Sequence, residues 1–139
     1  MNQKDAVLGM DELQDILMRN PFAVSIGMEL LEVSQGYARA RIQLQPHLQN
    51  IYGGMHGGCA FSLADTLAGM AASTYGGHVT TLNASVNYMR PVAETQYLYC
   101  EARVLRNGGK ISVVRTELTD DDGKLLIDGS FTYYNLRKI

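Results

Sequence analysis

One stretch of the chain, residues 56–77, constrains the fold more than any other. It is apolar over about five turns of helix, and Asp65 is its only charged side chain. A helix without a wide polar stripe must be enclosed by protein on most sides. The stretch has too many small and hydroxyl-bearing residues, and too few Leu, Ile and Val, for a bilayer span. We therefore predict a buried central helix that ends where Gly76-Gly77 supplies a left-handed cap.

Strand patterns lie on both sides of this helix. Two strands are predicted before it, over residues 28–34 and 37–44, where apolar and polar side chains alternate. Four more are predicted after it, over residues 79–89, 96–105, 110–118 and 124–136. Turn-forming segments join these four strands, so we expect a meander. The pattern predicts an α+β fold in which an antiparallel sheet wraps around a long central helix.

The ends and the composition indicate one globular domain over residues 1–139. Residues 11–19 place apolar side chains on one helical face, and Asn20-Pro21 then closes the segment. Residues 1–21 are thus a helical lead-in. With 46% hydrophobic and 19% charged residues, the chain suits a packed core. No apolar region follows a basic start, so we expect a cytoplasmic protein with no membrane partner.

The cysteines and the charge balance narrow the chemistry. Cys59 and Cys100 form no CxxC pair and no zinc-ligand set, so we expect free thiols and no metal or organic cofactor. A net charge of −2, without a basic aromatic surface, argues against a nucleic-acid partner. Ser62 lies outside any GxSxG elbow, so no serine triad is indicated.

Asp65 is the first candidate for chemistry. A carboxylate two turns into an apolar helix faces desolvation unless donors or a polar cleft compensate. Three readings remain open: a general base or nucleophile in a cleft, a structural partner of the backbone or of an arginine, and a helix boundary that leaves Asp65 near solvent.

His56-Gly57-Gly58 marks the start of the same helix. The first amide groups of a helix have no intrahelical partner, and the helix dipole favours negative charge there. Glycines let a ligand approach these amides closely, so the segment is a candidate oxyanion site. The alternatives are a phosphate loop, which lacks its usual lysine here, and a simple tight turn.

The segment NIYGGMHGGCAFSLADTLAG, followed by SVNYMRPV, resembles the hotdog-fold acyl-CoA thioesterases of the phenylacetate-pathway (PaaI-like) type. The shared pattern is an Asn, a glycine-containing loop, HGG, a helix with LAD, and a strand that ends before proline. The resemblance covers roughly residues 22–135. It implies the hotdog fold and an acyl-CoA substrate. It also implies homodimers that pair into homotetramers, with each active site shared between two chains.

The resemblance also implies roles for single residues. Asp65 matches the carboxylate that activates the attacking water or, in a variant mechanism, attacks the thioester itself. Gly57 matches the residue whose backbone N–H polarises the thioester carbonyl. Asn50 matches the amide that orients substrate or water, and His56 matches a residue near the sulfur. Thr81, with Thr80 as its neighbour, falls where relatives have a hydroxyl that contacts the water.

Further residues are candidates for binding the CoA and acyl parts of the substrate. The CoA phosphates need cations or amides, for which Arg90, Arg106 and Lys110 are candidates, with a solvated turn as the alternative for Lys110. Gly58 at the helix start is a further substrate-binding candidate. Four apolar or aromatic residues are candidates for the acyl pocket and equally for plain core: Phe61, Leu67, Met70 and Tyr88. The acyl group is expected to be arylacetyl, by resemblance, or medium-chain aliphatic. The alternatives are a non-catalytic acyl-CoA sensor and a hotdog hydratase or dehydratase.

Overall fold

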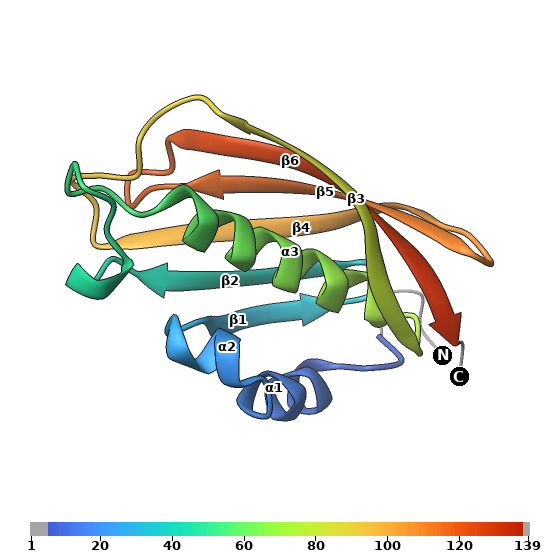
Figure 1. Ribbon diagram of the computed structural model, residues 1–139. Helices are drawn as coiled ribbons and strands as arrows, with labels where there is room; N and C mark the ends of the chain where they lie inside the picture. The colour runs from blue at the N-terminus through green and yellow to red at the C-terminus, as the bar shows by residue number, and fades with distance from the viewer. Residues whose placement is uncertain (1–5, 138–139) are drawn as a thin grey trace.

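A six-stranded antiparallel sheet curves around one long helix in the computed structural model of the protein, which describes residues 6–137 (Figure 1). The helices are α1 (Met10–Met18), α2 (Pro21–Ser25) and α3 (Gly57–Ser73), with a 3-10 turn, η1 (Pro46–Leu48). The strands are β1 (Glu29–Ser34), β2 (Tyr37–Gln43), β3 (His78–Tyr88), β4 (Tyr97–Asn107), β5 (Ile111–Thr119) and β6 (Leu125–Arg137). The predicted α+β arrangement of a sheet around a central helix is confirmed.

The order of the strands differs from the predicted meander. The sheet runs β1-β2-β4-β5-β6-β3, so only β4, β5 and β6 follow one another as hairpins. β3 instead pairs with β6 at the far edge, with Ala84 opposite Phe131, and β4 pairs with β2, with Ala40 opposite Cys100. Burial explains why β4, and not β3, lies beside β2 in the middle of the sheet. β4 places fully buried side chains against the helix, whereas no side chain of β3 is fully buried. The long connection over residues 89–96 lets the chain cross between the two positions.

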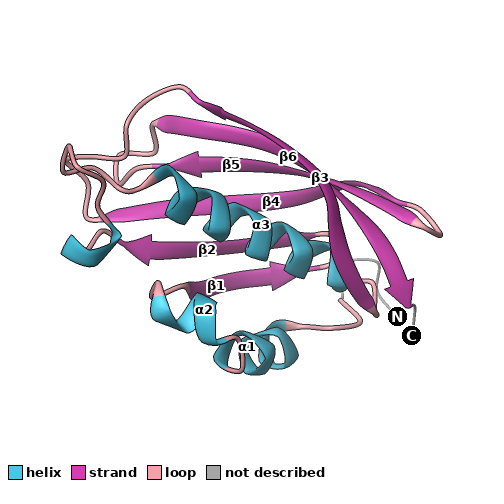
Figure 2. Ribbon diagram, viewed as in Figure 1, coloured by secondary structure: helices cyan, strands magenta, loops and turns pink. Residues whose placement is uncertain are grey.

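The helix α3 lies against the inner face of the sheet (Figure 2), and small side chains on both elements allow this close approach. Ala64, Ala68 and Ala71 on the helix are buried, as are Ala40 and Ala102 on the sheet. Larger apolar residues fill the space around this contact, among them Leu63, Leu67, Leu98 and Phe131. The helix is thus covered on most sides, as its apolar sequence predicts.

The two ends of α3 are fixed by side chains. At the start, Nδ1 of His56 accepts a hydrogen bond from the Gly58 N–H at 2.9 Å. At the end, the buried Thr74 hydroxyl donates to the Ala71 carbonyl at 2.7 Å and accepts from the Gly36 N–H at 2.8 Å. The helix therefore ends before the predicted Gly76-Gly77 cap. Both glycines have the expected positive φ, but they form the turn into β3.

The N-terminal region contains one helix more than predicted. The helix α1 ends before Asn20-Pro21, as expected, and buries Leu13 and Leu17. The chain then starts α2 at once, because Asn20 Oδ1 accepts from the Ala23 N–H at 3.1 Å and Pro21 stands at the first helical position. No helix within residues 6–137 is long and apolar enough to cross a bilayer.

Candidate active site

Asp65 lies half-buried in the middle of α3, and two strands donate hydroxyl groups to it. The Thr81 hydroxyl donates to Oδ1 at 2.9 Å. The Tyr133 hydroxyl lies 2.9 Å from the same oxygen and 2.6 Å from the Asp65 carbonyl, so its proton is shared between them. Within residues 6–137, no Lys or Arg pairs with Asp65, and Oδ2 accepts no hydrogen bond. The arginine-partner and helix-boundary readings are therefore wrong.

Tyr133 is a site residue that the sequence analysis missed. It is 2% exposed on β6 and belongs to the inward-facing row that also holds Phe131 and Asn135. Burial and then the charge of Asp65 raise the pKa of Tyr133 far above its usual value, so the hydroxyl remains a donor. The available signal was its place in an inward row of the last strand, but only the fold shows that this row passes under Asp65.

A pocket of about 420 Å³, here named the Asp65 pocket, opens beside this carboxylate. Its walls come from α1, from α3 and from the start of β3. Its lining residues include Ile16 on α1, Asp65, Gly69 and Ser73 on α3, Val79 on β3 and Tyr133 on β6. Its volume lies in the range of sites that take small molecules.

The start of α3 offers an unused donor. The Gly57 carbonyl accepts from the Tyr88 hydroxyl at 2.8 Å, and Gly58 N–H is taken by His56. The Gly57 N–H has no hydrogen-bond partner within residues 6–137. It stands at the positive end of the longest helix, so it suits an oxygen that develops negative charge. His56 therefore caps the helix, and its capping leaves Gly57 as the free amide.

Asn50 uses one end of its side chain to shape the loop before α3. Its Oδ1 accepts from the Tyr52 N–H at 2.8 Å and from the Gly54 N–H at 3.2 Å. The side-chain amino group has no hydrogen-bond partner in the described part of the chain. Asn50 and Gly57 line a second pocket of about 240 Å³, here named the Gly57 pocket, together with Tyr88 and Arg90.

The predicted site residues thus fall into two groups on one chain. Gly57 and Asp65 are eight residues apart in one helix, which corresponds to about 12 Å. A single thioester carbonyl cannot touch both, because attack and oxyanion binding each require contacts of about 3 Å. Each pocket of one chain therefore contains only half of the expected machinery.

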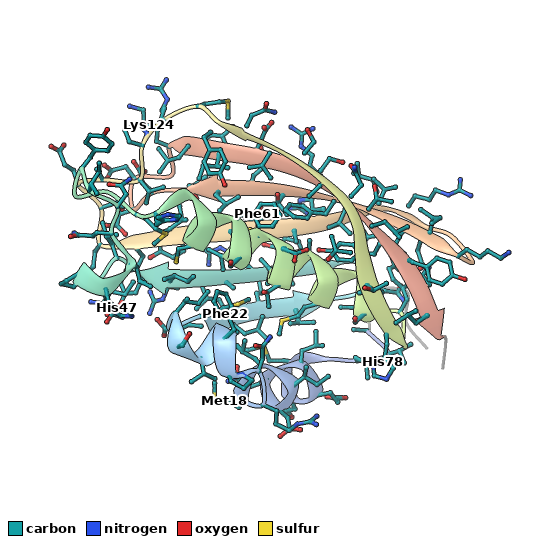
Figure 3. All side chains as sticks on the ribbon, in the orientation of Figure 1. Met18, Phe22, His47, Phe61, His78 and Lys124 are labelled. Carbon is teal, nitrogen blue, oxygen red and sulfur yellow. The ribbon has the colours of Figure 1, made fainter. Side chains whose placement is uncertain are left out.

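The remaining candidates are dispersed. Arg106 lies near the end of β4 and Lys110 in the turn to β5. This turn is at the opposite end of the sheet from the Asn50 loop (Figure 1). Phe61 points from α3 towards the sheet (Figure 3), and its ring lies 5.6 Å from that of Phe131. Neither Phe61 nor the fully buried Leu67 lines either pocket, whereas Met70 lines the Asp65 pocket. No group of three His, Cys, Asp or Glu within residues 6–137 is arranged to hold a metal ion.

Solved structures share this architecture. The conserved protein PA5202 from Pseudomonas aeruginosa is 36% identical with a TM-score of 0.78, covering 83% of this chain and 93% of its own. The Escherichia coli PaaI protein superposes with a TM-score of 0.87 at 20% identity, covering 92% and 93% of the two chains. A Streptococcus mutans protein solved with acetyl CoA has a TM-score of 0.77 at 23% identity, with coverage of 81% and 90%.

Sequence comparison gives the same family. The acyl-coenzyme A thioesterase PaaI of Escherichia coli is 24% identical over 102 residues, which is 73% of each chain. The profile of the thioesterase superfamily matches residues 52–127, a range that contains Gly57, Asp65 and Thr81. With more than half of its length matched by this profile and with the hotdog fold of the PaaI structures, the chain belongs to the thioesterase superfamily and is a thioester hydrolase.

Proposed function

We propose that the protein hydrolyses acyl-CoA thioesters to the free acid and CoA by water attack assisted by Asp65. The observation that carries the proposal is the Asp65 carboxylate, whose Oδ1 is fixed by Thr81 and Tyr133 while Oδ2 has no partner among residues 6–137. A carboxylate fixed in this way has one oxygen free to take a proton from water.

The proposed reaction uses the groups already described. Water gives a proton to Asp65 and adds its oxygen to the thioester carbon, and the Gly57 N–H binds the resulting oxyanion. In this scheme the amino group of Asn50, a residue that lines the Gly57 pocket, donates a second hydrogen bond to the carbonyl or to the water. The C–S bond then breaks, and the thiolate leaves without needing a strong acid. The proton taken by Asp65 passes to the thiolate or to solvent.

We infer that each active site is shared between two chains. The 12 Å separation along α3 requires Asp65 from one chain and Gly57 from another. The edge strand β3 is a surface through which two chains can pair. Its outer edge has no partner strand within the described sheet, and Leu82 at this edge is 54% exposed. Antiparallel pairing of two β3 strands about a two-fold axis reverses the second α3, so that Asp65 faces the other helix start. Pairing of such dimers into tetramers stays a prediction.

CoA as the carrier is supported by the relatives. The Streptococcus mutans neighbour was solved with acetyl CoA, and the Escherichia coli relative is an acyl-coenzyme A thioesterase. In this chain Arg90 lines the Gly57 pocket and is a candidate phosphate contact. A two-fold dimer would also bring the Lys110 end of one chain to the Asn50 end of the other.

The proposal is tested by thiol release with Ellman's reagent from acyl-CoAs between acetyl and palmitoyl, with phenylacetyl and benzoyl esters added. Asp65→Asn keeps an oxygen acceptor for Tyr133 and Thr81 but removes the base, so we expect kcat to fall by about 10²–10⁴. Asp122→Asn, in an exposed turn, is the matched control. Near-full activity of Asp65→Asn would refute the mechanism. Saturable binding of acyl-CoAs without hydrolysis by the wild type would instead indicate an acyl-CoA sensor.

A further inference from the structure

Gly69 is a glycine that the helix does not require. It lies in the interior of α3, four residues after Asp65 and therefore on the same face. Its φ is not positive, and glycine in a helix interior is less stable than alanine. At the other small positions of α3, such as Ala64 and Ala68, the chain uses alanine.

Packing does not exclude a side chain at this position. A Cβ at Gly69 would lie 3.6 Å from Tyr133 Cε1 and 3.7 Å from Val79 Cγ2, which are ordinary van der Waals contacts. Gly129 differs in this respect, since a Cβ there would lie 3.0 Å from the Thr116 hydroxyl. The fold therefore accounts for Gly129 but does not account for Gly69.

The space left by Gly69 belongs to the Asp65 pocket. Asp65, Gly69 and Ser73 line this pocket on successive turns of α3. Ser73 turns its hydroxyl back to the Gly69 carbonyl at 2.9 Å, which removes a polar group from the wall. The side chains of Ile16 and Val79 add apolar surface. Beyond Asp65 the wall along the helix is thus mainly apolar, although Asn20 and His78 also line the pocket.

We propose that Gly69 sets the size of the acyl group by leaving a hollow beside Asp65 for its hydrocarbon. This inference rests on the proposed function. Gly69 lies about 6 Å along the helix from Asp65. A carbonyl attacked at Asp65 would therefore bring a medium-length chain or a ring, but not an acetyl group, to this hollow.

The test compares Gly69→Ala with wild type on acetyl-CoA, octanoyl-CoA and phenylacetyl-CoA. The added methyl occupies the hollow, so kcat/KM for the two larger esters should fall about tenfold or more, while that for acetyl-CoA is unchanged. Tm should rise by about 3 °C because alanine favours the helix. Gly9→Ala adds the same methyl at a residue that lines neither pocket, at an ordinary contact distance of 3.8 Å from Glu12 Oε2, and is the control. Gly69→Val should lower kcat/KM for the two larger esters further.

Binding separates failure of this inference from failure of the proposed function. In an Asp65→Asn background, calorimetry should show that Gly69→Ala weakens octanoyl-CoA binding about tenfold and leaves acetyl-CoA binding unchanged. Equal loss for all esters, no loss for any, or a wild type that hydrolyses only acetyl-CoA would overturn the role of Gly69. A wild type that hydrolyses no ester, or an Asp65→Asn variant that stays active, would overturn the proposed reaction itself.

Discussion

At the scale of single residues, the position of Asp65 depends on hydroxyl groups from two strands distant in sequence. Thr81 comes from β3 and Tyr133 from β6, and both reach the same carboxylate oxygen. In the proposed reaction Tyr133 acts through Asp65, so we propose it as a positioning residue. The two donors restrict rotation of the carboxylate and keep Oδ2 available.

Tyr133→Phe should lower kcat with little change in KM. Loss of a hydrogen bond to a charged group is worth about 1.5–3 kcal/mol, which corresponds to a rate lower by about 10- to 150-fold. Tyr134→Phe is the control, because the next side chain on β6 faces the other side of the sheet and is exposed. Steady-state kinetics and circular dichroism at the assay temperature are the measurements. An unchanged kcat, or a loss confined to KM, contradicts the positioning role.

The thiols of Cys59 and Cys100 should not react with Ellman's reagent in the native protein. Cys59 is 8% exposed and Cys100 is fully buried, and burial raises the pKa of both thiols. Since the thiolate is the reactive form, native protein at pH 8 should release almost no chromophore, whereas unfolded chain should release two equivalents. Rapid stoichiometric reaction of the native protein would show that one thiol is more accessible than the structure indicates.

At the scale of the element, the start of α3 combines a side-chain cap with a free amide. His56 occupies the Gly58 N–H and adopts φ −59 and ψ 133, an extended conformation that residues before proline favour. Gly57 is the first helical residue, where proline is well tolerated. The amide can therefore be removed by substitution without removing the helix.

Gly57→Pro should lose activity while Gly57→Ala keeps most of it. Alanine retains the N–H, and its Cβ would lie 3.4 Å from the Tyr88 ring, an ordinary contact. Proline lacks the N–H, so kcat should fall about 10²–10³ as for loss of an oxyanion donor. The measurement is kcat of both variants, with melting curves to check that each variant is folded. Equal activities would mean that the Gly57 N–H does not bind the oxyanion.

At the scale of the whole molecule, each pocket of one chain holds only part of the residues expected in the site. The outer edge of β3 has no partner strand within residues 6–137, and we propose that a second chain completes the site there. The opposite edge of the sheet differs, because β1 is packed against α1 (Figure 1). We therefore expect two-fold pairing through β3 rather than through β1.

Complementation between inactive variants tests the shared site. When Asp65→Asn and Gly57→Pro chains are coexpressed in equal amounts, half of the dimers are mixed and each has one intact site. Activity should therefore recover to about a quarter of the wild-type value. Each variant expressed alone is the control. Absence of recovery in purified mixed dimers would place both residues of a working site on one chain.

Much of the site was predictable because its signals are local. The apolar helix with its lone carboxylate, the HGG segment at its start and the alternating strands are patterns over a few neighbouring residues. Helix ends were less predictable, because α3 stops where the Thr74 side chain bonds to Gly36, a residue 38 positions away. The short helix α2 was missed because Asn20-Pro21 both ends one helix and starts the next.

The sequence by itself determined which residues face the core, where the candidate carboxylate Asp65 stands on its helix and which family the motif resembles. Periodicity carries this information, since side-chain direction depends on local backbone geometry. Only the tertiary structure decided that β3 forms the far edge, that Tyr133 lies under Asp65, and that Gly57 and Asp65 line separate pockets. These features depend on which distant segments bury each other best, and that competition is settled across the whole chain rather than within any one segment.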